Sequence, residues 1–501
     1  MKGNSFSGLW RALLLFSVAF AMTSASATPL WLPYPASGYR NNSNGSLNNV
    51  GSNGYVWLSS ANSQNNAYNL NFNSSNVNPQ NNNNRANGFS VRPVQAFAET
   101  TEVSPFYLEM TLSRNELDRL LTLAYLDARQ NERTKNAQLV FELDLENNLR
   151  TLREELYARK YKPAPPMCFM IDTPREVFAP RFRDRIVSHL LFNMIAQPFD
   201  KLFIYDSYSC RKGKGTMKGV ERLEYHIRSC TENFTQRAYV LCLDISGYFM
   251  SINKGILYSI ICEEMQKHKN EWERTMDYSF VDYLVSVILF RNPTDGCVRI
   301  GDLSKWNKLP PHKSLFNARL GSGLTIGDVT SQLFSNIYLN PLDQYVKREL
   351  KCKHYGRYVD DIRIVDSSKH RLAEVSKYVS AYVGQNLGLR LNPNKTRIVR
   401  ADKTIDFLGA EVKRFGRYAN NRTLTRFAEC LDDRNKRSLS SVNAYLGYLK
   451  HFRSDRAVGK IVKKESLPQE WEYVPQKHKI IINNSSYGKT DNDMGLDAAA
   501  V

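Results

Sequence analysis

The stretch His354-Tyr-Gly-Arg-Tyr-Val-Asp-Asp-Ile-Arg-Ile-Val-Asp366 decides the fold of this chain. β-Forming residues stand on both sides of two adjacent carboxylates, Asp360 and Asp361, so the pattern predicts a strand, a tight turn and a second strand. Aspartate is common in turns because its side chain bonds nearby backbone groups. Taken alone, the pair is therefore more typical of a solvated acidic turn than of a functional site.

A third carboxylate ends an apolar stretch about 116 residues earlier. Residues 238–245 are typical of a buried strand, and Asp244 lies at its end. Burying an unpaired carboxylate costs several kcal/mol, so such a residue normally has a partner or a metal, although capping the next helix is an alternative role. If this strand pairs with the hairpin, three carboxylates converge, and like charges so close require bound cations. Two Mg²⁺ ions roughly 3.5–4 Å apart would fit such a site.

A basic, glycine-rich loop lies upstream of these carboxylates. Its sequence is Ser207-Tyr-Ser-Cys-Arg-Lys-Gly-Lys-Gly-Thr216, and a helix is predicted to begin at its end. Glycines let backbone amides approach an anion, and the helix N-terminus adds its dipole. The GxxxxGK[ST] spacing of a P-loop is absent, so a solvated basic loop is the alternative. The candidates for triphosphate binding are Arg211, Lys212 and Lys214.

The composition favours a polyanionic partner. The 501 residues carry a formal charge of +19, and the excess lies after about residue 110, including two predicted basic helices at 422–452. Such a region is suited to binding phosphates, and its affinity should fall with salt. The eight cysteines form no CxxC pair or zinc spacing, which indicates reduced thiols in a cytosolic protein.

The first 27 residues instead have the form of a secretory signal peptide. Lys2 and Arg11 precede the apolar run Ala12–Met22, and Ala25-Ser-Ala27 is typical of a signal-peptide cleavage site. The run is too short to span a bilayer, and no other stretch approaches 18 apolar residues, so no transmembrane helix is predicted.

Residues 28–95 are rich in asparagine, including the run Asn81–Asn84. Low-complexity disorder is one interpretation. The stretches Gly54–Ser59 and Gly88–Pro93 are typical of strands and favour a folded module instead.

Further elements follow from hydrophobic periodicity and turn residues. Helices are predicted from Ser113 to about 124, and over 138–158, 183–199, 216–229, 254–264, 278–289 and 369–387, and a long helix after Gln332 ends at about Leu350. Strands are predicted within 168–178 and 406–412, with irregular backbone at 291–320 and no firm pattern after Pro468.

From about residue 110 to 455 the chain resembles reverse transcriptases, with the motifs in family order. Leu243-Asp-Ile-Ser-Gly-Tyr-Phe249 resembles palm motif A, and Tyr358-Val-Asp-Asp361 resembles motif C. Leu391–Thr396 resembles motif D, Phe407-Leu-Gly409 the primer grip, and 172–216 the fingers motifs. The resemblance implies an α+β right-hand polymerase fold and an RNA-directed DNA polymerase that uses an RNA template, a primer and dNTPs.

The resemblance also assigns roles to particular positions. It implies two Mg²⁺ ions at Asp244, Ile245, Asp360 and Asp361, of which Asp361 is the least certain ligand. Lys395 matches the candidate general acid for pyrophosphate release, with a plain turn lysine as the alternative. Phe249 lies where the family places its sugar-discriminating gate, with ordinary core packing as the alternative. Ile326 and Gln332 are expected to line the template–nucleotide pocket.

The stretch Ile326-Gly-Asp-Val-Thr-Ser-Gln332 indicates which subfamily of reverse transcriptases the chain resembles. Most reverse transcriptases begin it with Gln-Gly and end it with Ser-Pro, whereas this form is similar to reverse transcriptases of diversity-generating retroelements. Such enzymes copy a template-repeat RNA, misincorporate opposite adenines, and work with a small basic accessory protein. Ile326 cannot donate the hydrogen bonds of glutamine, so checking of the template–dNTP pair should loosen. Retron, group II intron and phage-defence enzymes are the alternatives.

Residues 31–95 resemble the variable end of retroelement target proteins. Asparagine codons carry two adenines each, so a repeat rich in mutable adenines would read as clustered asparagine. The hypothesis is a translated template repeat joined to the polymerase frame. A secreted ligand-display protein is the alternative from another functional class.

The protein is predicted to be cytoplasmic, and its chain is predicted to divide into seven parts. They are a leader (1–27), the asparagine-rich segment (28–95), a helical extension (96–165), fingers (166–237), a palm that contains insertions of the fingers (238–412), a thumb (413–460) and a tail (461–501).

Overall fold

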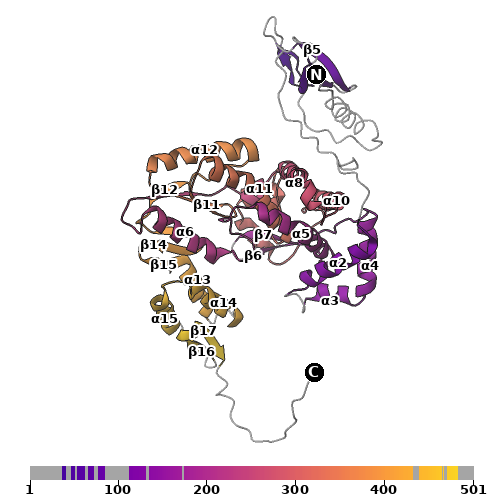
Figure 1. Ribbon diagram of the computed structural model, residues 1–501. Helices are drawn as coiled ribbons and strands as arrows, with labels where there is room; N and C mark the ends of the chain where they lie inside the picture. The colour runs from indigo at the N-terminus through magenta and orange to yellow at the C-terminus, as the bar shows by residue number, and fades with distance from the viewer. Residues whose placement is uncertain are drawn as a thin grey trace, which may run out of the picture. The chain divides into compact units, whose positions relative to one another are not determined.

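The computed structural model divides into two compact units, Met1–Tyr107 and Leu108–Val501 (Figure 1). It describes residues 112–130, 135–171, 174–432, 439–464, 467 and 471–482, together with the backbone of five strands between Ser37 and Asn84. The predicted leader, the strand predicted at Gly88–Pro93 and the residues after Ile482 lie outside the described residues.

The first unit contains five strands. β1 (Ser37–Arg40) pairs with β2 (Leu47–Val50), and β3 (Gly54–Ala61), β4 (Asn66–Phe72) and β5 (Val77–Asn84) form an antiparallel sheet. The predicted strand at Gly54–Ser59 is therefore confirmed as part of β3. The run Asn81–Asn84 pairs with residues 66–69 of β4. Backbone N–H and C=O groups make this ladder, so it can form in spite of the low β-propensity of asparagine.

The second unit begins with three helices, α2 (Arg114–Ala128), α3 (Asn136–Glu142) and α4 (Leu145–Tyr157). Ser113 caps α2 as predicted, because its hydroxyl accepts from the Glu116 amide at 3.2 Å. The single helix predicted over 138–158 is wrong. Asp144 leaves the helical conformation at φ −136° and ψ 54°, so the chain makes two helices there.

The palm sheet has the strand order β10-β11-β8-β12, and every neighbouring pair is antiparallel. Its strands are β8 (Tyr239–Leu243), β10 (His354–Tyr358), β11 (Asp361–Asp366) and β12 (Arg397–Arg400). The predicted hairpin at 354–366 is confirmed as β10 and β11. β8 lies beside β11, so the sheet joins two parts of the chain more than a hundred residues apart.

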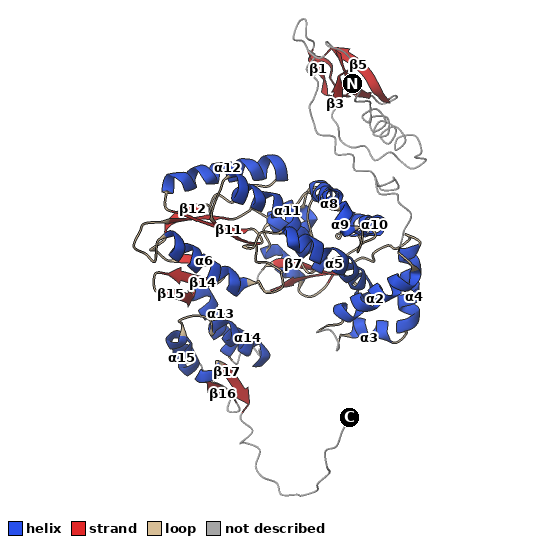
Figure 2. Cartoon of the chain, in the orientation of Figure 1, coloured by secondary structure: helices blue, strands red, loops and turns tan. Residues whose placement is uncertain are grey.

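Helices cover both faces of this sheet (Figure 2). α12 (Lys369–Leu387) contacts β8, β11 and β12. On the other face, Val240, Cys242 and Val365 belong to a core cluster shared with α6 (Thr216–Cys230). Consecutive strand residues point to opposite faces, so the unbroken apolar run of β8 is explained by burial on both sides.

The fingers are built around β6 (Met167–Ile171), β7 (Arg175–Ala179) and the short β9 (Val298–Arg299). The long helix α5 (Phe182–Leu202) packs against α2, and also against α10 (Tyr278–Phe290) and α11 (Val329–Gln344), which ends in a π-helical turn at Tyr345–Glu349. The remaining helices here are α7 (Tyr248–Ser251), α8 (Lys254–Lys267) and α9 (Lys269–Trp272). The predicted irregular segment 291–320 contains β9 and three short 3₁₀ turns, Leu303–Lys308, Pro311–Lys313 and Leu315–Asn317.

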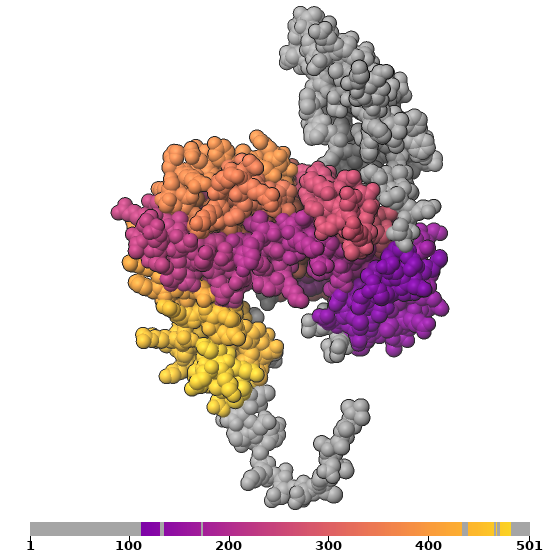
Figure 3. Space-filling model, in the orientation of Figure 1, coloured from indigo at the N-terminus to yellow at the C-terminus, as the bar shows by residue number. Residues whose placement is uncertain are grey.

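The thumb region follows a three-stranded sheet of β13 (Ile405–Phe407), β14 (Ala410–Lys413) and β15 (Gly416–Ala419). Its helices are α13 (Asn421–Leu431), α14 (Leu439–Leu449) and α15 (Asp455–Lys464). A hairpin of β16 (Trp471–Val474) and β17 (Lys479–Ile482) was not predicted, and its buried Ile480 joins the thumb core. In Figure 3 an open hollow separates the yellow thumb from the indigo helical extension.

Two further observations concern the cysteines and the helices. None of the eight cysteines, all of which lie in described segments, forms a disulfide. Among the residues that the structure describes, no helix is both long and apolar enough to cross a membrane.

Candidate active site in the palm

The two carboxylate motifs meet at one edge of the palm sheet. Tyr358 pairs with Asp361, which leaves Val359 and Asp360 as a two-residue turn. Ile362 of β11 pairs with Leu243 of β8, so Asp244 follows β8 beside the start of β11. The strand pairing on which the convergence of the three carboxylates depended is therefore present in the structure.

The turn itself is strained. Val359 has a φ of +53°, a conformation that β-branched residues rarely adopt because the side chain meets the backbone. Such a residue persists only where its surroundings hold it, at a cost on the order of 1–3 kcal/mol. The Val359 carbonyl accepts a hydrogen bond from Arg357 Nη1 at 2.9 Å.

Burial and neighbouring carboxylates raise the pKa values of Asp360 and Asp361. Burial, and then the nearby Asp244 carboxylate, raises the pKa of Asp360 to about 6. Burial also raises the pKa of Asp361, against the opposing effect of Arg363. The site therefore gathers three carboxylates on buried and partly buried residues, and a bound cation would offset their repulsion.

Side-chain cations hold two of these carboxylates. Lys395 Nζ lies 2.6 Å from Asp244 Oδ2, and Asn392 Nδ2 donates to Asp244 Oδ1 at 3.3 Å. Arg363 forms an ion pair with Asp361 and donates to the Asp406 carbonyl at 2.9 Å. The contacts of Lys395 and Asn392 with Asp244 therefore join the motif D turn to motif A.

The donor set fits a divalent cation. Carboxylate oxygens are the ligands that Mg²⁺ prefers, and Asp244, Asp360 and Asp361 supply them from adjacent strand ends. Within the described residues, no three Asp, Glu, His or Cys side chains are already arranged around one metal position. Ile245 is buried beside them and forms an isolated bridge to Leu391.

Phe249 and Ile326, two predicted pocket residues, come together in the structure. Both pack against a small core cluster that contains Phe178 and Leu315. The Ile326 carbonyl accepts from the Phe178 amide at 2.9 Å, and the Phe249 carbonyl accepts from the Leu324 amide at 2.9 Å. Gln332, by contrast, is exposed on α11.

Comparison with known families agrees with this geometry. Residues 170–412 match the family described as reverse transcriptase (RNA-dependent DNA polymerase), and this range contains every carboxylate of the site. Because of this match, residues 170–412 are called the reverse transcriptase domain. The family description confirms the predicted enzyme class, and the palm topology agrees with the predicted right-hand α+β fold.

Other similarities are more distant. Residues 27–94 match a domain of unknown function. The chain is 24% identical over 314 residues to Protein YkfC of Escherichia coli strain K12, covering 55% of this chain and 74% of that protein.

Telomerase structures are also similar in part. An apo telomerase from Candida tropicalis, truncated from the C-terminal domain, has a TM-score of 0.38 and 14% identity over 51% of this chain and 55% of that one. A Candida albicans telomerase in complex with a telomeric RNA fragment has a TM-score of 0.36 and 12% identity over 66% of this chain and 60% of that one. The chain thus spans little more than half the length of either telomerase.

The glycine-rich loop of the reverse transcriptase domain uses Arg211 differently from the prediction. Its five hydrogen bonds go to the Asp200 carboxylate and to the carbonyls of Asp200, Ile204 and Ser207. Arginine has five N–H donors, so none is left for a triphosphate in this arrangement. The prediction that Arg211 binds triphosphate directly is corrected here, because the guanidinium holds the loop together.

Two other cations of the loop remain available. Lys212 is exposed, and Lys214 Nζ lies 3.2 Å from the centre of the Tyr205 ring. Burial, and then the neighbouring Arg211, lowers the pKa of Lys214. The base of the loop is fixed by Asp206, whose carboxylate accepts from Arg222 Nε at 2.7 Å.

We expect different replacements in this loop to affect either the binding of dNTPs or the stability of the protein. Changing both Lys212 and Lys214 to alanine should raise the KM for dNTPs about tenfold with little loss of stability, because Lys212 is exposed and Lys214 is only partly buried. Arg211→Ala should lower the free energy of unfolding by about 1–3 kcal/mol, because it leaves the carbonyls of buried Ser207 and partly buried Ile204 unpaired and removes the ion pair with Asp200. Steady-state primer extension and urea unfolding measure the two effects. A raised KM in Arg211→Ala with unchanged stability would contradict the assignment.

Residues that the sequence alone did not identify also shape the site. Arg357, Asp343, Arg363 and Asn392 all lie within hydrogen-bonding distance of a catalytic-motif residue or of one another. The sequence does contain one sign of them. Arg357 and Arg363 are each flanked by apolar or aromatic strand residues, and a buried guanidinium requires a partner.

Proposed function

We propose that the chain copies an RNA template into cDNA, with dNTPs as substrates and two Mg²⁺ ions held by Asp244, Asp360 and Asp361 next to Ile245. The observation that carries the proposal is the pairing of β8 with the β10–β11 hairpin inside a reverse transcriptase domain. The bound ions would supply activation of the primer hydroxyl and stabilisation of the leaving oxygen.

The protein side chains have their own tasks in this reaction. Lys395, next to Asp244, is suited to give a proton to the departing pyrophosphate once its ion pair opens. Lys212 and Lys214 are suited to binding the triphosphate. Phe249 is suited to excluding a 2′-hydroxyl through its position in the pocket cluster.

Primer extension on a defined RNA template tests the activity. We expect incorporation of dNTPs that depends on a divalent cation, and much weaker incorporation of ribonucleotides. A full-length protein that binds template and primer but never extends the primer would contradict the proposal.

A narrower assignment rests on Ile326–Gln332. We propose a reverse transcriptase of a diversity-generating retroelement, which acts in the cytoplasm with a small basic accessory protein. Ile326 and Phe249 pack against the same small core cluster, which supports a direct influence of Ile326 on the pair formed by the template base and the incoming dNTP. A retron, group II intron or phage-defence enzyme is the alternative, and errors concentrated opposite template adenines distinguish the first option from the others.

Ile326→Gln is expected to lower misincorporation opposite adenines about fivefold or more. A glutamine amide can hydrogen-bond where the isoleucine side chain cannot, and one hydrogen bond is worth about 1 kcal/mol or more when its loss leaves a polar group unpaired. Sequencing of cDNA made by both proteins on one template measures the change. Val329→Ile, an apolar change within the same stretch, is the control. An unchanged error spectrum in Ile326→Gln would show that the side chain of Ile326 does not determine the fidelity of copying.

The asparagine-rich segment supports two further hypotheses. We propose that residues 28–95 are a translated template repeat, and sequencing the surrounding DNA tests this. The absence of any nearby, adenine-substituted copy would exclude the hypothesis. A ligand-display module is the alternative, because residues 27–94 match a domain of unknown function and contain a β-sheet. Isolation of a secreted form that lacks residues 1–27 would favour the display module.

A further inference from the structure

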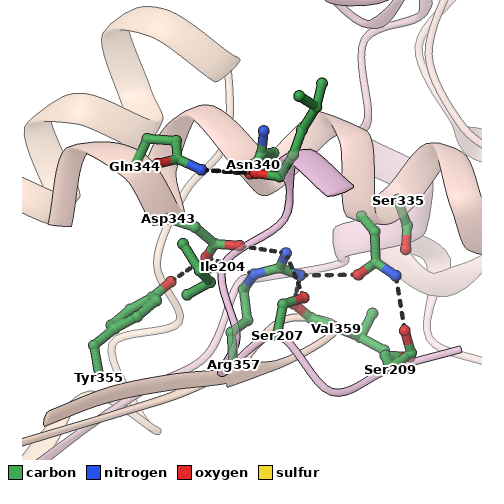
Figure 4. A network of polar contacts seen from close by, with 12 residues as sticks. Ile204, Ser207, Ser209, Ser335, Asn340, Asp343, Gln344, Tyr355, Arg357 and Val359 are labelled. Carbon is green, nitrogen blue, oxygen red and sulfur yellow. Dashed lines mark hydrogen bonds and ion pairs between the residues drawn. The ribbon is translucent and has the colours of Figure 1, made fainter. Parts of the chain in front are cut away.

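Arg357 is fully buried next to the catalytic turn, and every one of its N–H donors is used. Nε and Nη2 donate to the Asp343 carboxylate at 2.8 and 2.7 Å. Nη1 donates to the Val359 carbonyl at 2.9 Å and to Asn336 Oδ1 at 3.4 Å. Nη2 also donates to Ser207 Oγ at 3.2 Å. Figure 4 shows this guanidinium at the centre of its acceptors.

The acceptors come from three separate parts of the reverse transcriptase domain. Asp343 and Asn336 belong to α11, Ser207 begins the glycine-rich loop, and Val359 is in the catalytic turn. The backbone repeats the connection. The Arg357 carbonyl accepts from the Tyr208 amide at 3.0 Å, and the Arg357 amide donates to the Asp206 carbonyl at 2.9 Å.

Close packing fixes the same junction. A Cβ added at Gly356 would lie 2.4 Å from the Tyr208 hydroxyl oxygen, so only glycine lets the loop approach β10. Asn336 Nδ2 donates to the Ser209 carbonyl at 2.8 Å, which attaches the loop to α11 as well. These contacts fix the glycine-rich loop, α11 and the β10–β11 hairpin in position relative to one another.

Stability alone does not explain this arrangement. Asp343 and Arg357 are both 0% exposed, and a buried ion pair is often no more stabilising than apolar residues of similar volume. What the pair supplies is geometry, because the planar fork of arginine binds a carboxylate with two bonds and still reaches other acceptors. One of those acceptors is the carbonyl of strained Val359, immediately before Asp360.

We propose that Arg357 is a positioning residue that holds the Val359–Asp360 turn, and that it couples the placement of Asp360 to the glycine-rich loop through Ser207. The catalytic part of this inference rests on the proposed polymerase function. Arg357 touches no reacting atom in this scheme. It acts through the Val359 carbonyl, with Asp343 holding its guanidinium in place.

A graded set of variants tests the catalytic consequence. We expect kcat per folded molecule to fall about 30-fold in Arg357→Lys, less in Asp343→Asn and about twofold in Ser207→Ala, because small misplacements of reacting groups cost large factors in rate. The KM for dNTPs should change less than about threefold. The matched control is Leu372→Ala, a buried change on α12 that loses stability without touching this network.

Hydrogen exchange of the backbone amides tests the positioning itself, with no need for activity. We expect the amides of residues 358–362 to exchange about tenfold faster in Arg357→Lys than in the wild type, while those of α12 stay unchanged. Unchanged exchange in the turn would overturn the proposal, as would equal losses of kcat in Arg357→Lys and Leu372→Ala. If the wild-type protein fails to extend primers, the polymerase function fails, and the exchange result still decides the positioning role.

Discussion

Asp360→Asn is expected to lower the rate of primer extension at least about 10³-fold while the protein stays folded. The amide cannot replace a charged ligand for a divalent cation, and loss of such electrostatic stabilisation typically costs several kcal/mol of barrier. Stability should rise slightly instead of falling, because the change removes one of three crowded carboxylates whose burial is unfavourable. Rates of single-nucleotide incorporation and thermal unfolding measure the two effects.

The matched control is Asp402→Asn. Asp402 is an exposed carboxylate in an ion pair with Arg400, so its loss removes one negative charge at the surface. We expect its rate to stay within about twofold of the wild type, because exposed ion pairs contribute little. Full incorporation by Asp360→Asn would exclude the two-metal mechanism, whereas a large loss in Asp402→Asn would point to a general effect of charge.

Glu176→Leu is expected to lower the free energy of unfolding by about 3 kcal/mol. Glu176 is 0% exposed, and its carboxylate accepts from Trp306 Nε1, Ser314 Oγ and the Leu315 amide at 3.1, 2.7 and 2.7 Å. Leucine would leave three donors without a partner in the interior, and each costs about 1–3 kcal/mol, partly offset by removing a buried charge.

The effect should reach the active site as well. Leu315 packs in the same cluster as Phe249 and Ile326, so release of segment 303–315 should loosen the pocket wall and raise the KM for dNTPs. Urea unfolding gives the stability change, and Glu176→Gln, which keeps an acceptor, should cost less. Glu374→Leu on the exposed side of α12 should change stability by less than about 0.5 kcal/mol. A Glu176→Leu protein as stable as the wild type would show that the segment is held by other contacts.

Local patterns predicted most elements of the second unit. The hairpin at 354–366, the helix after Gly215 and the cap at Ser113 all depend on neighbours within a few residues. The failures have local causes too. Asp144 interrupts a periodic apolar stripe, and the β16–β17 hairpin owes its stability to burial of Ile480 in the thumb core, which no short pattern reveals.

The asparagine run is a similar case. Asn81–Asn84 has the composition of a disordered segment, yet its backbone pairs with β4. Pairing depends on a partner strand and on register, neither of which is encoded in the run itself.

The sequence by itself predicted a polymerase-type palm with Asp244, Asp360 and Asp361 as its carboxylates, because each of these residues stands in a short strand or turn motif that can be recognised locally. Only the tertiary structure decided what surrounds them. Arg211 binds its own loop, Lys395 pairs with Asp244, and Arg357 joins the catalytic turn to α11 and the glycine-rich loop. Arg357 and the Val359 carbonyl are 2 residues apart, but Lys395 and Asp244 are 151 residues apart, and whether two side chains meet over so long a separation depends on the packing of the whole domain.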